Sequence, residues 1–210
     1  MKLEGERWRT LVSTVRLGRD EYRVVRPARP LAHAPLYLSG HGAQMIVDKA
    51  SARELAMAWA FAIRSARTLV YLPLRHTQYA CCGYGDGTEA LQDLVLMHDT
   101  LAFPASRWKD VRARLGQGRP HTVDILGLPE VECAEYEAEA LRHHGAADTV
   151  FISGSRKALA LEGNALRTLV EECPRHMHEN PGTHCCAEIS AGEVGDWLHV
   201  IYCAEHRVHV

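Results

Sequence analysis

The residues best suited to chemistry gather near the C-terminal end of the sequence. Between residues 173 and 209 there are four Cys and six His, all of them potential metal ligands. Cys173 with His176, and Cys203 with His206, are each spaced as C-x-x-H. Such spacing lets one tight turn present a thiolate and an imidazole to the same ion, and zinc prefers these ligands in a tetrahedral shell. We therefore predict a structural Zn²⁺ site formed by these four residues.

Rival ligands lie inside the same segment. They are His178, His184, Cys185 and Cys186, within the sequence CPRHMHENPGTHCC. The C-x-x-H spacing differs from that of common zinc fingers, so the choice between the two ligand sets stays open. A second interpretation also stays open, in which the cysteines are buried core residues and the histidines are surface residues without a ligand.

The redox state of the cysteines follows from where the chain is expected to work. The first ten residues, MKLEGERWRT, are charged at almost every second position and lack the apolar stretch of an export signal. The longest apolar run, residues 56–63, is far shorter than the roughly 20 residues of a membrane span. We therefore expect a cytoplasmic protein with no membrane partner, in which the seven Cys are free thiols or metal ligands rather than disulfides.

A second group of candidates surrounds the glycine-rich stretch RHTQYACCGYGDGT at residues 75–88. Cys81 and Cys82 follow His76 there, and His41 lies in an earlier predicted loop. A catalytic thiol needs exposure and a cationic neighbour that lowers its pKa, and imidazoles near a loosely restrained loop can supply both. These four residues are the candidates for a Cys/His hydrolase.

One of these histidines lies in a motif with a known counterpart. LYLSGHGAQ at residues 36–44 resembles the histidine motif of caspase-like and metacaspase peptidases, which implies that His41 is a general base. In that family a second strand ends directly in the nucleophilic Cys, whereas the corresponding strand here runs into Arg75 and Cys81 follows six residues later. We therefore interpret the motif as a hairpin bend that contains a His between two Gly.

Predicted hairpins and helices alternate along the chain and would position these residues. β-branched runs around turn residues predict hairpins over 10–27, 35–47, 94–103 and 149–161. Capping residues and helical spacing predict helices over 52–65, 106–115, 129–144 and 164–173. Further strands are predicted at 67–73, 121–128 and 197–203.

The spacing of these elements predicts an internal repeat. Hairpins begin at Leu36, Leu94 and Thr149, which are 58 and 55 residues apart, and each is followed by a helix. The period suggests three units of about 55 residues, over 9–66, 67–120 and 121–175, followed by a Cys/His-rich strand segment over 176–210. Chance similarity of short apolar strings is the alternative. Either way we predict a single α+β domain over 1–210, with a mixed or antiparallel sheet and helices packed on it.

Charge and motifs limit the function classes. The net charge is −2, so the chain lacks the strongly basic balance of a dedicated nucleic-acid binder, and no phosphate-binding loop motif occurs. No catalytic motif is complete. We therefore predict a cytoplasmic, non-catalytic binding or regulatory module with a structural zinc site near the C-terminus, acting on a protein or small-molecule partner. The alternative is a thiol- or metal-dependent hydrolase that uses a Cys/His pair.

Overall fold

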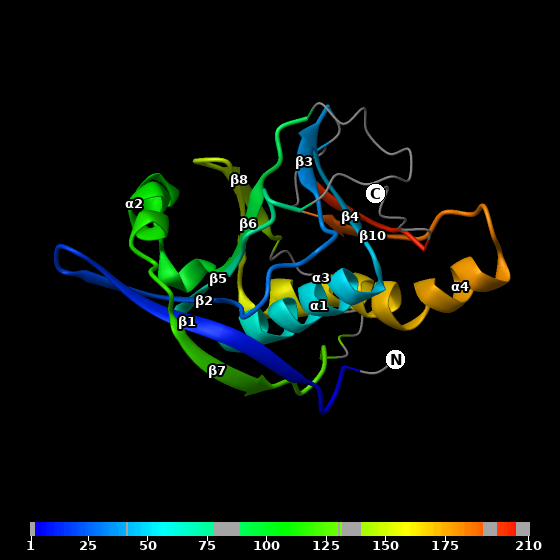
Figure 1. The fold of residues 1–210 in the computed structure, drawn as a ribbon, viewed down its shortest axis with the longest axis horizontal. Helices are drawn as coiled ribbons and strands as arrows, with labels where there is room; N and C mark the ends of the chain where they lie inside the picture. Colours follow the sequence, from blue (N-terminus) through cyan, green and yellow to red (C-terminus); the bar gives the residue numbers. More distant parts are fainter. Residues whose placement is uncertain are drawn as a thin grey trace.

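The computed structural model describes residues 3–40, 42–77, 89–129, 131, 140–190 and 197–204. Two sheets and four α-helices occur in these residues, and helices α1 and α3 lie side by side near the centre of the view (Figure 1). The predicted α+β class is therefore confirmed.

The larger sheet has seven strands in the order β7, β1, β2, β5, β6, β9, β8. Its strands are β1 (Arg7–Leu17), β2 (Asp20–Pro27), β5 (Thr68–Leu72), β6 (Asp93–His98), β7 (Arg119–Asp124), β8 (Arg142–Gly145) and β9 (Thr149–Gly154). The smaller sheet has the order β10, β11, β4, β3, with strands β3 (Leu36–Ser39), β4 (Gly42–Val47), β10 (Cys186–Ser190) and β11 (Trp197–Tyr202). Both sheets mix parallel and antiparallel pairs.

The main core joins both sheets to helices α1 (Lys49–Arg64) and α3 (Arg156–Glu171). Trp59 of α1 is fully buried and donates its indole N–H to the Leu159 carbonyl of α3 over 2.7 Å. A Cβ added at Gly163 would lie 3.4 Å from the Trp59 ring, so the small residue permits this close approach. A second core, around Trp108 of helix α2 (Trp108–Ala113), packs against the larger sheet.

Several predicted elements are confirmed. The first hairpin is the pair β1 and β2, with Gly18 at a φ of 67° in its turn, a conformation that glycine adopts without strain. The motif around Gly40 does join two antiparallel strands, β3 and β4. The predicted helix over 52–65 is α1, although it begins earlier because Asp48, rather than Ser51, caps its first turn. The predicted terminal strand is β11.

The predicted threefold repeat is not confirmed, because the three positions have different topologies. Only the first is a hairpin: β6 leads into short 3₁₀ turns, and β9 leads directly into α3, whose first turn is capped by Ser155. Asn164, predicted to begin a helix, therefore lies inside one. Residues 132–139 of the predicted helix over 129–144 lie outside the described residues, but its predicted end is wrong, since Arg142–Gly145 pairs with β9 as a strand.

Candidate metal centre

The smaller sheet places one face on the helices and presents another face with polar side chains. In β10 and β11, Ala187, Ile189, Leu198 and Val200 are buried against the main core. Because side chains alternate along a strand, Cys186, Glu188, Trp197 and His199 project from the opposite face. The antiparallel register sets Glu188 directly across from His199.

Three side chains of this region form a group with metal-ligand chemistry. The ligand atoms of His184, Cys186 and His199 all lie within 4.8 Å of one another. The His184 and His199 rings are 5.5 Å apart, and Trp197 stacks on His199 with ring planes 8° apart. Stacking restricts the orientation of the His199 imidazole.

The buried nitrogen of His199 is the most informative atom of the group. Its Nε2 is inaccessible to solvent and has no hydrogen-bond partner among the described residues. Buried polar atoms are nearly always satisfied, so such an atom requires an explanation. An ion held between His199, Cys186 and His184 would satisfy it.

Electrostatics around the group favour neutral ligands before an ion binds. Burial lowers the pKa of His199, and the neighbouring His184 lowers it further, while Glu188 opposes the shift. Burial, followed by the charge of Glu188, raises the pKa of the Cys186 thiol. A neutral imidazole is the form that binds metal, and a coordinated thiol loses its proton to solvent. Without a metal, the raised pKa makes Cys186 a poor nucleophile.

The structure does not bring together the four ligands that the C-x-x-H spacing predicts. Cys173, at the start of helix α4 (Cys173–Glu179), forms a disulfide with Cys185, so neither sulfur is available to an ion. His176 is exposed and lies 3.2 Å from the Thr183 hydroxyl. Cys203 is a buried free thiol, and His206 lies outside the described residues.

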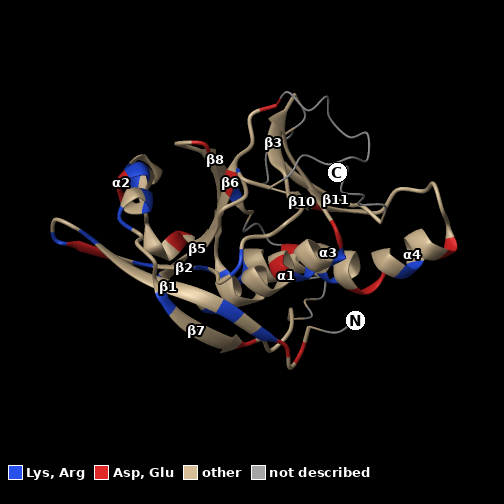
Figure 2. Cartoon of the chain, viewed as in Figure 1, with Lys and Arg blue, Asp and Glu red and all other residues tan. Residues whose placement is uncertain are grey.

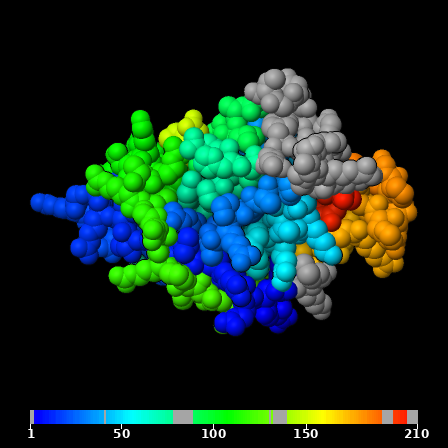
Figure 3. All heavy atoms as spheres, in the orientation of Figure 1, coloured from blue at the N-terminus to red at the C-terminus, as the bar shows by residue number. Residues whose placement is uncertain are grey.

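The disulfide corrects the expectation that all the cysteines are free. Helix α4 returns the chain so that its first residue lies beside the residue before β10, with Cα atoms 5.7 Å apart. Cys186 and Cys203 are outside any disulfide, as was expected of all the cysteines. Figure 3 shows the surface of β11, in red, next to that of α4, in orange, at one end of the molecule.

The four rival ligands predicted from the sequence occupy different places in the structure. His184 and Cys186 belong to the candidate metal centre, Cys185 is in the disulfide, and His178 is an exposed residue of α4. The third member, His199, was counted among the Cys and His of this region but not predicted as a ligand. Its alternation with buried neighbours in WLHVIY was the available signal, but the sequence contains no indication of which strand it faces.

The candidates for a catalytic Cys/His pair cannot be placed relative to one another. His76 is exposed, whereas His41, Cys81 and Cys82 lie outside the described residues. The hydrolase assignment therefore stays a prediction. His98, which falls inside the predicted hairpin over 94–103, is instead the buried last residue of β6 and contacts the end of helix α1.

The fold and the candidate centre define an α+β protein with a potential His/Cys metal site. Comparisons with protein-family models, with curated proteins and with solved structures found no match to this chain. Over the residues that the structure describes, no helix has both the length and the apolar composition needed to cross a membrane.

Proposed function

We propose that this protein is a non-catalytic binding module in which a Zn²⁺ ion on His184, Cys186 and His199 fastens β10, β11 and the segment before β10 to one another. The observation that carries the proposal is the convergence of ligand atoms of His184, Cys186 and His199 within 4.8 Å, and the buried, unsatisfied Nε2 of His199 supports it. Mixed imidazole and thiolate ligands select zinc over Mg²⁺ or Ca²⁺, which prefer oxygen.

A structural role requires a fourth ligand that closes the shell. Glu188 faces His199 across the sheet and is the candidate for that ligand, although its carboxylate lies outside the group of atoms within 4.8 Å and would have to change rotamer to reach an ion. If instead water held the fourth position, the site would resemble the three-ligand centres of zinc enzymes. Whether Glu188 binds the ion therefore distinguishes a binding module with a structural zinc from a metal-dependent hydrolase.

Metal binding by the purified chain tests the proposal. We expect one equivalent of Zn²⁺, measured by elemental analysis, and Co²⁺ absorption bands that include a thiolate charge-transfer band. Loss of an outer-shell partner typically costs 10- to 100-fold in metal affinity. His199→Ala and Cys186→Ser each remove a ligand and are expected to cost at least about 100-fold. His178→Ala, an exposed histidine of α4, is the matched control and is expected to bind normally.

Glu188→Ala removes a ligand if Glu188 completes the shell, and is then expected to weaken zinc binding by at least about 100-fold, as the other ligand variants do. Unchanged affinity in this variant would favour an open position and the hydrolase alternative. Equal metal binding by wild type, His199→Ala and Cys186→Ser would contradict the site itself.

The cytoplasmic location stays a prediction. A reducing compartment would open the Cys173 to Cys185 bond, and that bond does not include Cys186. The proposed zinc ligands are therefore the same in either redox environment.

A further inference from the structure

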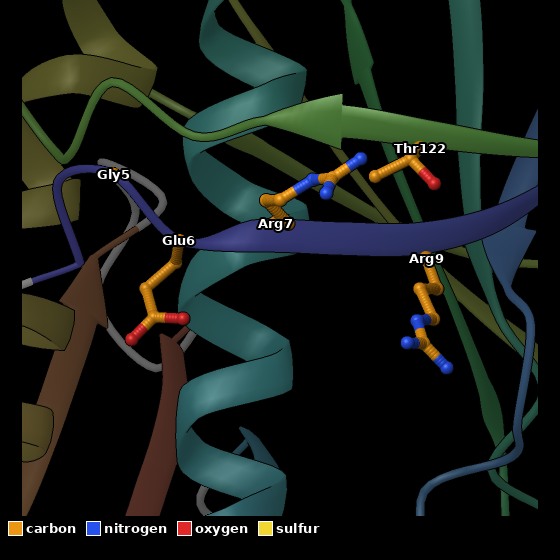
Figure 4. Close-up of a pocket in the computed structure, with 5 residues that line it drawn as sticks. All are labelled: Gly5, Glu6, Arg7, Arg9 and Thr122. Atoms are coloured by element: carbon orange, nitrogen blue, oxygen red, sulfur yellow. The ribbon is translucent and has the colours of Figure 1, made fainter.

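Two adjoining hollows on the outer side of β1 share a pair of arginines. The first has a volume of about 420 Å³ and is lined by Gly5, Glu6, Arg7, Arg9 and Thr122 (Figure 4). The second has a volume of about 350 Å³ and is lined by Arg7, Arg9, Ala28, Arg29 and Glu54. Together they extend from β7 across β1 to the segment that follows β2.

The alternation of β1 explains why both arginines lie outside. Trp8 and Thr10 point into the protein and are buried, so Arg7 and Arg9 project from the opposite face. Figure 4 shows the Arg7 guanidinium near Thr122 of β7, which is the strand partner of Arg9, whereas the Arg9 guanidinium points to the other side of β1. The two guanidinium groups therefore lie on opposite sides of one strand, and both arginines line both hollows.

The acidic residues that line the hollows are already engaged. Glu6 forms an ion pair with Arg53, and Glu54 accepts a hydrogen bond of 2.8 Å from the Trp8 indole. Burial raises the pKa of Glu54, while its hydrogen bond from Trp8 and the charge of Arg53 oppose the shift.

The cations are less engaged than the acids. Arg7 lies 3.8 Å from Asp124, but both side chains are more than 70% exposed, so this pair is weak. Among the described residues, no acidic partner contacts Arg9 or Arg29. Lys and Arg recur along β1 in Figure 2. The hollows therefore carry uncompensated positive charge.

We propose that these hollows bind the phosphate chain of a small anion with at least two phosphoryl groups. Arg7 and the Thr122 hydroxyl would hold one phosphoryl group, and Arg9 with Arg29 would hold the next. The planar guanidinium fork matches phosphate oxygens in a bidentate manner. Among the described residues that line the two hollows none is aromatic, so they offer no base-stacking surface and the phosphates are the part expected to be recognised. The proposal is independent of the metal centre.

Calorimetric titration of the full chain, kept metal-free with a chelator, tests this site. Inorganic triphosphate and adenosine triphosphate are the probes, and we expect one site for each, with affinities within about threefold of each other and reduced by added salt. Arg9→Gln and Arg29→Gln are each expected to weaken binding about tenfold, since a hydrogen bond to a charged group is worth roughly that factor.

Arg19→Gln is the matched control, because Arg19 is an exposed arginine in the turn between β1 and β2 and lines neither hollow. It removes the same charge and is expected to change binding less than twofold. Glu54→Gln keeps an acceptor for Trp8 while removing a negative charge, so it should tighten binding. Circular dichroism checks that each variant is folded.

Three results would overturn the proposal. One is the absence of saturable triphosphate binding up to about 10 mM, which is weaker than a charge-paired site should be. Another is an equal loss of affinity in Arg19→Gln and Arg9→Gln, which would indicate diffuse attraction. The third is a single-stranded oligonucleotide that binds far more tightly than triphosphate, which would make this a nucleic-acid surface.

Discussion

At the scale of single residues, Asp93 is the centre of a buried charge network. Its side chain is only 2% exposed and accepts hydrogen bonds from the Tyr71 hydroxyl, from the backbone N–H groups of Leu74 and Arg75, and from the Arg75 and Arg112 guanidinium groups. Burial and the negative charge of Asp93 raise the pKa of Tyr71 above its usual range. The network connects β5, β6 and α2.

Asp93→Asn is expected to lower the free energy of unfolding by about 3 kcal/mol. The substitution removes the buried charge that pairs with Arg75 and Arg112 and places an amide N–H among the donors around it, although Asp148 still pairs with both arginines. Denaturant unfolding measures the change. Asp110→Asn, on the exposed side of α2, is the control and is expected to change stability by less than about 0.5 kcal/mol. Similar values for the two variants would show that the network does not stabilise the fold.

At the scale of elements, His98 connects the end of β6 to the end of α1. Its Nε2 lies 2.9 Å from the Ala62 carbonyl oxygen and 3.1 Å from that of Ile63, in the last turn of the helix. The last carbonyls of a helix lack the usual donor four residues later, and here the Ser65 N–H donates to the Ala62 carbonyl. In the tautomer that has its hydrogen on Nε2, His98 donates to these carbonyl groups and stabilises the helix end inside the core.

His98→Ala is therefore expected to lower the free energy of unfolding by about 2 kcal/mol, because it leaves buried carbonyl groups with one donor fewer and creates a cavity. The measurement is again denaturant unfolding. His121→Ala, at an exposed position of β7, provides the comparison and should be nearly neutral. If both variants unfold alike, the helix end does not depend on His98.

At the scale of the whole molecule, the C-terminal third is tied together by covalent and strand contacts. The disulfide joins α4 to the residue before β10, and β11 inserts between β10 and β4. The Tyr202 N–H donates to the Cys185 carbonyl over 2.9 Å, so the disulfide residue also contacts the end of β11. These contacts fix the positions of β10 and β11, the strands that carry the candidate metal centre.

Reduction of the disulfide is expected to lower the free energy of unfolding by about 3 kcal/mol, the value that chain entropy predicts for a loop of this length, since 12 residues separate the two cysteines. Unfolding with and without dithiothreitol measures it. The double variant Cys173→Ser, Cys185→Ser should be insensitive to the reductant, because the remaining described cysteines are free. A reductant effect that persists in this variant would assign the stability to something else.

The sequence by itself determined the elements whose signals are local. Alternation around Gly18 predicts the first hairpin, helical spacing of Leu55 and Trp59 predicts α1, and aromatic and β-branched residues predict β11. The enrichment of Cys and His near the C-terminus indicated the region in which the candidate metal centre lies. Each of these patterns depends on residues a few positions apart, so no long-range contact is needed to read it.

Only the tertiary structure decided which residues meet. The pairing of β11 with β4 and β10 brings His199 to Cys186, and the return of α4 joins Cys173 to Cys185 rather than to an ion. The helix caps also depended on the tertiary structure. Ser51 and Ser155 are both suitable N-cap residues, but only Ser155 caps a helix, whereas Asp48 caps α1. Strand register and disulfide pairing depend on packing between segments far apart along the chain, and a local pattern contains no information about which distant segment will supply the partner.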